Sequence, residues 1–456
     1  MGATKLECGA QTAERRDDAS MRAFRHDRFG QFIHWGLYSL PAGTWDGTTY
    51  DFAAEFLQQS AQIPRERWAQ LTDAFSACAF DAASWARTAR DLGARYVTIV
   101  TKHNDGFCLW PSAYTDFTVA ATSLGRDVIG ELVDAYTEQG IAVHLYYSVL
   151  DWHHPDWRAT LDGPEDERAF ARYLGFASDQ LRELATRYPA VRGFWFDGTW
   201  DESVKANGRW TLETERMLKQ LVPGAIVNSR LRSDEHGARH RDSNGALMGD
   251  YFSGYERRLP APWDRSVATD DWEACMTIPQ NSWGYHAGAE VARTHKRPAE
   301  LIEQLVHAVS LSGNMLLNFG PRGDGAFPDF ELEAVRVLGD WLADNGECVY
   351  GCGMAQEWDY PGWGFYTRNA DTGIVYAVVT RVPVAGVISP RLPENARVRR
   401  VTVLPTGATV PFTELDSRTI RVEVGAASAP SVFALDVEGR AGSDESSEIN
   451  PDLALV

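Results

Sequence analysis

The sequence predicts an α/β protein, a (β/α)8-like TIM barrel followed by a C-terminal antiparallel β-sandwich domain. Between residues 29 and 346, eight short β-branched or aromatic runs alternate with longer segments of helical periodicity. After residue 350, strand-like runs follow one another at sandwich spacing, with no helical segment between them. A chain of 456 residues can hold two unequal domains of this kind.

Each of the eight runs in the first region is expected to form one parallel strand of the barrel. They cover residues 29–35, 96–103, 143–148, 193–197, 225–230, a short run near Asp250, another near Cys275, and residues 315–319. Helices are expected between them, because apolar residues recur three and four positions apart. The clearest stripes are Val128, Leu132, Val133 and Tyr136, and then Leu301, Leu305, Ala308 and Val309.

The second region is expected to be a small sandwich domain. Its strand-like runs cover residues 374–380, 398–404, 420–424 and 432–437, and turn signals such as Pro405-Thr406-Gly407 separate them. The final residues are rich in Ser, Asp and Glu, which is typical of disorder. We therefore expect an N-terminal tail over 1–20, the barrel domain over 21–350, the sandwich over 351–439 and a disordered acidic tail over 440–456.

The composition argues against several classes of partner. The 44 basic and 63 acidic residues give a net charge of −19, so neither nucleic acid nor an anionic membrane surface is an expected partner. No apolar stretch approaches the ~18 residues of a membrane span. The first 20 residues lack the apolar core of a secretory signal. We expect a cytoplasmic chain, or a secreted one whose signal has been removed; the sequence does not determine its oligomeric state.

Polar residues gather where the barrel strands end, which is where barrel proteins carry function. The strand ends read His34-Trp35-Gly36, Lys102-His103-Asn104-Asp105-Gly106, Tyr146-Tyr147-Ser148, Trp195-Phe196-Asp197-Gly198 and Asn228-Ser229-Arg230. Asp197 is the strongest candidate for a reacting carboxylate, although an Asp at this position can also cap the next helix. A nucleophilic or general-base carboxylate needs a second one to serve as the acid. The spacing leaves this open among Asp250, Glu256, Asp270, Asp271 and Glu273.

Aromatic residues beside carboxylates favour a sugar-binding site, since indole and phenol faces pack on the apolar patches of a sugar. This accounts for part of a high content of 16 tryptophans. We expect Trp35, Trp110, Trp152, Trp195 and Trp283 in or near the site. The competing hypothesis is a metal site built from His34, His103, Asp105, His144, His153, His154 and Asp156. The first strand lacks a His-x-His pair, and no zinc-type cysteine spacing or nucleotide-binding motif is present. We therefore expect neither metal nor cofactor.

The ordered motifs resemble those of the α-L-fucosidases of glycoside hydrolase family 29. The resembling stretch runs from Arg28-Phe29-Gly30-Gln31-Phe32-Ile33-His34-Trp35-Gly36 to Asn314-Met315-Leu316-Leu317-Asn318-Phe319-Gly320-Pro321. Between them lie the strand-end motifs given above, followed by Trp272-Glu273-Ala274-Cys275 and Ser282-Trp283-Gly284-Tyr285. Each motif is weak by itself, but their order and spacing together are highly specific.

The resemblance implies a retaining double displacement that releases terminal α-L-fucose from an oligosaccharide or glycoconjugate. Asp197 matches the nucleophile, and Glu256 in Asp250-Tyr251-Phe252-Ser253-Gly254-Tyr255-Glu256 fits the acid/base, with Glu273 as the alternative. Fucose-binding positions carry over to His34, Glu55, Phe56, His103, Asn104, Tyr146, Trp195, Arg230 and Trp283. Trp283 is expected to pack on the C5 methyl group.

Two positions depart from the family pattern. The chain has His103-Asn104 where two histidines are usual, and Glu55-Phe56 where a Glu-Trp pair is usual. We expect activity to persist, since neither change touches the nucleophile. Residues 108–112 and the aromatic segment 255–263 favour α-1,3/1,4 linkages. The alternatives are an inactive carbohydrate-binding protein on the same scaffold and a hydrolase acting on L-galactosides.

Overall fold

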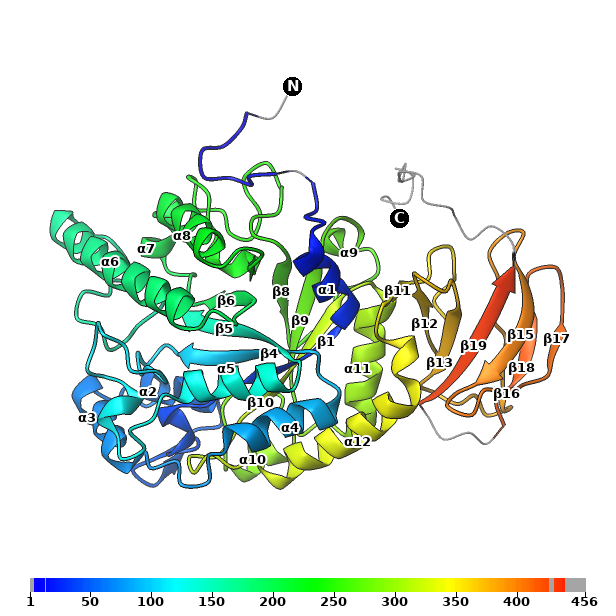
Figure 1. Cartoon of the computed structure of the whole chain (residues 1–456), viewed down its shortest axis with the longest axis horizontal. Helices are drawn as coiled ribbons and strands as arrows, with labels where there is room; N and C mark the ends of the chain where they lie inside the picture. The colour runs from blue at the N-terminus through cyan, green and yellow to red at the C-terminus, as the bar shows by residue number, and fades with distance from the viewer. Residues whose placement is uncertain (1–3, 13, 426–429, 439–456) are drawn as a thin grey trace.

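The computed structural model describes residues 4–12, 14–425 and 430–438, and it confirms the predicted fold class (Figure 1). A parallel sheet of eight strands has the order β7-β6-β5-β4-β1-β10-β9-β8. In chain order the strands are β1 (Phe29–Ile33), β4 (Tyr96–Lys102), β5 (Ala142–Ser148), β6 (Gly193–Asp197), β7 (Ile226–Val227), β8 (Phe252–Glu256), β9 (Trp272–Thr277) and β10 (Asn314–Phe319). Each of the eight predicted runs therefore forms a strand. Most of these strands are buried along their whole length, as expected for a sheet covered by helices.

The barrel closes between its two edge strands, β7 and β8, through a single parallel bridge that joins Asn228 to Tyr251. The Ser229 amide donates to the Tyr251 carbonyl over 3.0 Å, and the Asp250 amide donates to the Val227 carbonyl over 2.8 Å. Strand β7 is shorter than the predicted run 225–230, because the chain turns into the 3-10 helix η5 (Ser229–Leu231). This turn carries Arg230 across the end of the barrel.

Helices surround most of the barrel. The longer ones are α4 (Ala82–Leu92), α5 (Val128–Glu138), α6 (Pro164–Arg187), α8 (Gly208–Leu221), α11 (Pro298–Ser310) and α12 (Asp329–Asn345). The two predicted helical stripes are the buried faces of α5 and α11. Between β7 and β8 the described residues 232–249 form loops and turns in place of a helix. No helix in the described part of the chain has the length and apolar surface that crossing a membrane requires.

Shorter helices fill the connections and flank the barrel. They are α1 (Ala19–Asp27), α2 (Leu57–Ser60), α3 (Arg65–Ala69), α7 (Glu202–Lys205), α9 (Arg265–Thr269) and α10 (Ala289–Ala292), with the 3-10 helices η1 (Leu37–Ser39), η2 (Ala54–Phe56), η3 (Gln70–Ala74), η4 (Val119–Ala121) and η6 (Gly346–Cys348). A small hairpin joins β2 (Thr44–Trp45) to β3 (Thr48–Thr49). The described part of the expected N-terminal tail is attached to the barrel, since the amides of Cys8 and Ala10 donate to Glu235 and Asp242.

The C-terminal region consists of two antiparallel sheets. One has the order β11 (Cys352–Met354), β12 (Gly364–Asn369), β13 (Val375–Val379), β19 (Ser431–Glu438), β15 (Arg397–Val403) and β16 (Ala408–Thr409). The other has the order β14 (Val387–Ile388), β18 (Ile420–Glu423) and β17 (Phe412–Glu414). The four predicted strands correspond to β13, β15, β18 and β19. The other five are two to six residues long and did not stand out in the pattern. The expected tail 440–456 lies outside the described residues.

The sandwich packs against helices α11 and α12, on the outside of the barrel (Figure 1). His307 of α11 stacks on Phe365, with ring centroids 4.7 Å apart. The indole nitrogen of Trp341 on α12 donates to the Pro430 carbonyl over 3.0 Å. Side chains of β13 and β19, among them Val378 and Val432, join the core cluster of the barrel. The sandwich thus extends the apolar core, and its strand β11 contacts Arg28 and Ser312 at the amino ends of β1 and β10.

Candidate active site

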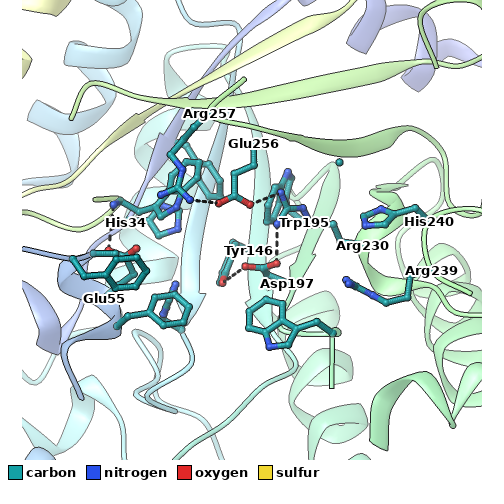
Figure 2. Close-up of a pocket in the computed structure, with 18 residues that line it drawn as sticks. His34, Glu55, Tyr146, Trp195, Asp197, Arg230, Arg239, His240, Glu256 and Arg257 are labelled. Carbon is teal, nitrogen blue, oxygen red and sulfur yellow. Dashed lines mark hydrogen bonds and ion pairs between the residues drawn. The ribbon is translucent and has the colours of Figure 1, made fainter. Parts of the chain in front are cut away.

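A cavity of about 320 Å³ lies at the carboxyl ends of the barrel strands. Every residue predicted for the site lines it except Asn104 (Figure 2). These residues are His34, Glu55, Phe56, His103, Tyr146, Trp195, Asp197, Arg230, Glu256 and Trp283. They come together because parallel strands that are distant in sequence end at the same rim of a barrel. Within the described residues, the sandwich domain contributes nothing to the cavity wall.

One guanidinium group connects the two candidate carboxylates. Arg230 Nη1 donates to Asp197 Oδ1 over 2.9 Å, and Arg230 Nη2 donates to Glu256 Oε2 over 2.9 Å. Asp197 ends β6 and Glu256 ends β8, so the contact spans the place where the barrel closes. The guanidinium is held by the Ser253 carbonyl, which accepts from Nε over 2.9 Å. Its carbon lies 4.6 Å above the centre of the Trp195 ring.

The two carboxyl groups titrate in opposite directions from their ordinary values. Burial raises the pKa of Asp197, and the negative charge of Glu256 adds to this while Arg230 opposes it. Burial also disfavours ionised Glu256, but the charges of Arg230 and Arg257 outweigh it and lower the pKa of Glu256. The Arg257 Nη2 atom lies 3.2 Å from Glu256 Oε1. The two carboxyl groups share one cation and form a coupled pair.

Aromatic and imidazole rings form one wall of the cavity. Tyr146 stacks on Trp195 on one side and on His103 on the other, with ring centroids 5.5 and 5.6 Å apart. The Tyr146 hydroxyl donates to Asp197 Oδ2 over 3.4 Å. His34 Nδ1 pairs with the Asn318 side chain over 2.7 Å. Burial lowers the pKa of His34 and lowers that of His103 to about 3, so both imidazoles are neutral hydrogen-bonding groups near neutral pH.

Glu55 is a buried carboxyl group on the same side of the cavity as His34 (Figure 2), carried by the 3-10 helix η2. Its Oε2 atom accepts from the amides of Trp283 and Gly284 over 3.2 and 2.9 Å. Its Oε1 atom has no partner among the described residues. Burial raises the pKa of Glu55 to about 7, although the two amides oppose the shift. Phe56, the next residue, packs edge-on against His103 and Trp152, with ring centroids 6.3 and 5.5 Å away.

Asn104 lies outside the cavity, which corrects its expected place among the sugar-binding residues. Its Oδ1 atom accepts from the Ser148 hydroxyl over 2.6 Å, and its carbonyl accepts from the Trp152 amide over 2.8 Å. Neighbouring side chains at this strand end face different ways, so His103 reaches the cavity and Asn104 holds the loop after β5. The adjacent buried pair Lys102–Asp151, 2.8 Å apart, fixes the same loop.

Glu273, the alternative acid/base residue, lies behind the cavity wall in β9. It accepts from the indole nitrogen of Trp195 over 2.9 Å and from the Tyr96 hydroxyl over 2.7 Å. It does not line the cavity. Burial raises the pKa of Glu273 to about 7, although both donors oppose the shift. Glu273 is thus placed to orient the Trp195 ring that faces the cavity.

Of the five tryptophans expected in or near the site, Trp195 and Trp283 line the cavity and the other three do not. Trp35 packs against Phe80 and Trp85 in the core, and Trp110 donates to Glu183 over 2.8 Å. Trp152 contacts Phe56 from outside the cavity wall. Sequence reasoning could not tell these rings apart from Trp195 and Trp283, since a tryptophan at a strand end can face either the barrel interior or the surrounding helices.

Further residues line the cavity without having been predicted. They are Phe32, Phe52, Ala53, Trp200, Arg239, His240, Gly254 and Arg257. Phe32 and Arg257 adjoin predicted motifs, so neighbouring positions could have suggested them. Arg239 and His240 come from the helix-free segment 232–249 and carried no signal in the sequence.

The histidines weighed as metal ligands do not form one cluster, because only His34 and His103 meet in the cavity, with ring centroids 5.6 Å apart. His144 stacks on Tyr96, His153 on Phe117, and His154 contacts Phe176. Across the described residues, no group of three or more His, Cys, Asp or Glu side chains is arranged to hold a metal ion.

Comparisons with known proteins agree with the geometry. The family described as Alpha-L-fucosidase matches residues 3–347. A solved structure of a family 29 α-L-fucosidase from Bacteroides thetaiotaomicron superposes with a TM-score of 0.92 at 47% identity, covering 96% of this chain and 100% of that one. It is a covalent intermediate trapped with 2-fluoro-fucosyl fluoride in a glutamate-to-glutamine variant.

More distant relatives have the same description. A Thermotoga maritima α-fucosidase in complex with a mechanism-based inhibitor has a TM-score of 0.72 at 26% identity, covering 91% of this chain and 96% of that one. The tissue α-L-fucosidase of Rattus norvegicus is 29% identical over 409 residues, which cover 84% of this chain and 81% of the relative.

The raised pKa of Glu273 predicts a measurable effect on stability. An unfolded glutamate releases its proton near pH ~4.3, whereas the folded chain holds this one up to about pH 7. The stability that this proton contributes is fully present below the unfolded pKa and is lost as the pH rises through the folded pKa. Glu273→Gln keeps an acceptor for Trp195 and cannot ionise. The difference in melting temperature, variant minus wild type, should therefore increase by about 2–4 °C between pH 5 and pH 8.

Differential scanning calorimetry at both pH values measures this difference. The matched control is Glu333→Gln, an exposed change on α12 that should leave the difference constant. A Glu273→Gln difference that does not change with pH would show that Glu273 is ionised throughout this range.

Proposed function

The chain belongs to the α-L-fucosidase family, glycoside hydrolase family 29, and on this premise we propose how its cavity carries out retaining hydrolysis of a terminal α-L-fucoside. Asp197 is the nucleophile and Glu256 the general acid/base. The observation that carries this assignment is the contact that both residues make with Arg230. Among the described residues that line the cavity, only Asp197 and Glu256 offer carboxylates that bind this guanidinium. Glu55, the third carboxyl group there, is held by backbone amides.

The first half-reaction forms a fucosyl-enzyme. An oxygen of Asp197 attacks C1 of the sugar, the C1–O bond to the leaving group breaks, and Glu256 gives its proton to the departing oxygen. In the second half-reaction, Glu256 takes a proton from a water molecule whose oxygen attacks C1, and the bond from C1 to Asp197 breaks. The fucose leaves with its original anomeric configuration. The covalent intermediate of the Bacteroides relative supports this sequence for the chain.

The pKa shifts of the two carboxyl groups oppose the roles that the mechanism gives them. The nucleophile must be ionised and the acid protonated, yet burial raises the pKa of Asp197 while Arg230 and Arg257 lower the pKa of Glu256. The two groups are coupled through Arg230, so the pH limbs of kcat/KM belong to the pair rather than to either residue. A sugar that moves Glu256 away from Arg230 and Arg257 would raise the pKa of Glu256, as the role of acid requires.

Fucose recognition is proposed for the neutral and aromatic wall. His34 and His103 are buried and neutral, so either imidazole can donate to or accept from a hydroxyl group. Glu55 offers its free Oε1 atom to another hydroxyl. Trp283 and Phe56 supply apolar surface for the C5 methyl group, which favours fucose over L-galactose, whose additional hydroxyl would lose hydrogen bonds there.

A preference for α-1,3/1,4-linked fucose is the finer part of the proposal. Of the two segments that suggested it, residues 108–112 include the buried Trp110, so their support is lost. The second segment, 255–263, reaches the cavity through Glu256 and Arg257, whereas its aromatic residues Tyr255 and Trp263 do not line it. Two other rings, Phe52 and Trp200, line the cavity and are exposed by 51% and 36%. A branched acceptor can lay a second sugar on such rings, whereas a linear substrate leaves one of them uncovered.

Replacement of the nucleophile gives the first test. We expect Asp197→Gly to lower kcat for an aryl α-L-fucoside by about 1,000-fold or more, because no covalent intermediate can form. Added azide should fill the space of the lost carboxylate and yield β-fucosyl azide, identified by NMR. Wild-type turnover in the variant would contradict the assignment, and α-fucosyl azide, the product of retention, would show that the nucleophile is another carboxylate.

Removal of the acid separates Glu256 from Glu273. We expect Glu256→Ala to lower kcat/KM on a natural fucosyl-oligosaccharide by about 100- to 10,000-fold. Glu256→Ala should lower kcat/KM far less on a dinitrophenyl fucoside, whose leaving group needs no proton. Glu273→Gln should affect both substrates equally, because it acts through the Trp195 ring. The opposite pattern in the two variants would transfer the acid role to Glu273.

A panel of substrates tests the activity and the linkage together. The purified chain is incubated with an aryl fucoside and with α-1,2-, α-1,3- and α-1,4-fucosylated oligosaccharides, and released fucose is quantified. We expect cleavage of the aryl fucoside and kcat/KM values for the branched α-1,3 and α-1,4 substrates above that for the α-1,2 substrate. Binding without release would favour the inactive carbohydrate-binding alternative, and equal rates would contradict the linkage preference.

A further inference from the structure

We propose that Arg239 and His240 form a subsite that binds an anionic substituent, a sulfate or a carboxylate, on the leaving group of the substrate. The inference rests on the proposed function, because it assigns the part of the cavity beyond the bound fucose. It adds a class of substrate that the family membership does not specify, fucosides with a negatively charged leaving group.

Arg239 differs from the other cations of the cavity in lacking a carboxylate partner. Arg230 binds both Asp197 and Glu256, and Arg257 lies 3.2 Å from Glu256. No carboxylate of the described residues lies within 4 Å of the Arg239 guanidinium, although the chain has a net charge of −19. Its Nη2 atom donates to the Thr199 hydroxyl over 2.7 Å, and its buried Nε atom has no partner there.

An unpaired guanidinium that is partly withdrawn from water indicates a missing ligand. A buried donor without an acceptor costs about 1–3 kcal/mol, and a charged group costs more. A sulfate or carboxylate can accept two parallel hydrogen bonds from one guanidinium, whereas a neutral hydroxyl accepts from one nitrogen at a time. The chemistry of Arg239 therefore favours an anion over the hydroxyl groups of an uncharged sugar.

The segment that carries these residues is held in place by its own hydrogen bonds. Asp234 Oδ1 accepts from the amides of His236 and Ala238 over 2.8 and 2.9 Å. The Met248 amide donates to the His240 carbonyl over 2.8 Å. His240 has a φ angle of 63°, a conformation that is uncommon for residues other than glycine. The subsite is thus built into the fold before any ligand arrives.

His240 supplies the second group of the subsite. Its Nδ1 atom pairs with the Ser229 hydroxyl over 2.8 Å, so Nε2 is the ring nitrogen that remains for a ligand. Burial, together with the charges of Arg239, Arg230 and Arg241, lowers the pKa of His240 to about 3. The imidazole is therefore neutral, and it can donate one hydrogen bond to an anion that Arg239 binds.

The position of the pair assigns it to the leaving group. Figure 2 shows Arg239 and His240 beyond Arg230 and Asp197, on the side away from His34 and Glu55. The proposed fucose contacts lie at His34 and Glu55, so a group that reaches Arg239 must extend past the reacting carbon. Trp200 follows Thr199 in the chain and lines the same part of the cavity, where its partly exposed ring can support the acceptor sugar.

The test compares substrates that differ only in the charge of the leaving group. One pair is 3-carboxyphenyl and 3-carbamoylphenyl α-L-fucoside, and the other is a fucosylated disaccharide with and without a sulfate ester on the acceptor sugar. For the wild type we expect kcat/KM of an anionic member to exceed that of its neutral partner by about tenfold, the effect of one charge-assisted hydrogen bond. The pair that gives the larger ratio shows whether carboxylate or sulfate is preferred.

Variants then identify the residue responsible. Arg239→Gln should reduce the ratio to about one, and Arg239→Lys should keep part of it, because the charge stays while the bidentate geometry is lost. The control is Arg209→Gln, which removes an exposed arginine of α8 that pairs with Glu213 and should leave the ratio unchanged. Circular dichroism establishes that each variant is folded.

The outcomes separate this inference from the proposed function. Hydrolysis of the neutral substrates with a wild-type ratio of one in both pairs would overturn the anionic subsite and leave the fucosidase assignment intact. The same ratio in the wild type and in Arg239→Gln would also overturn it. Failure of the wild type to cleave any member would overturn the proposed function itself. The wild-type ratio needs no variant, so a poorly folded Arg239→Gln still leaves the inference open to refutation.

Discussion

The arrangement of the site depends on one arginine that lies where the barrel closes. Arg230 reaches Asp197 at the end of β6 and Glu256 at the end of β8, and it does so because η5 replaces the end of β7. The closing strands share only one bridge, which leaves the residues around Arg230 free to adopt loop geometry. The guanidinium is held by the Ser253 carbonyl and the Trp195 ring, so the separation of the two carboxylates follows from the barrel itself.

A layer of buried polar groups behind the cavity keeps its wall in position. Glu273 holds the Trp195 indole, Asn318 holds His34, and Asn104 with the Lys102–Asp151 pair holds the loop after β5. Burial keeps the proton on Glu273 up to about pH 7 and keeps the His34 and His103 imidazoles neutral. The part of the cavity proposed to hold the fucose thus has few fixed charges apart from the reacting carboxylates and their arginines, as suits a neutral sugar.

Several of the residues that sequence reasoning placed correctly share one property, their position at or near the carboxyl end of a buried strand. His34, Tyr146, Trp195 and Asp197 end strands whose hydrophobic runs are unmistakable, and a closed barrel brings such ends together. Asn104 and Trp35 met the same criterion and lie outside the cavity, because the local direction of a side chain depends on packing. The short strands of the sandwich, such as β14 and β16, are two residues long and have no periodicity to detect.

The sequence by itself determined the fold class, the eight barrel strands, the family and most of the residues that line the cavity, because hydrophobic periodicity and strand-end motifs are local properties of the chain. Only the tertiary structure decided that Glu256 lines the cavity while Glu273 lies behind its wall, since both residues end or begin strands of similar pattern. The tertiary structure also brought Arg239 and His240 to the rim. Their segment has neither helical nor strand periodicity, and its course is set by hydrogen bonds such as those of Asp234, which no local pattern reveals.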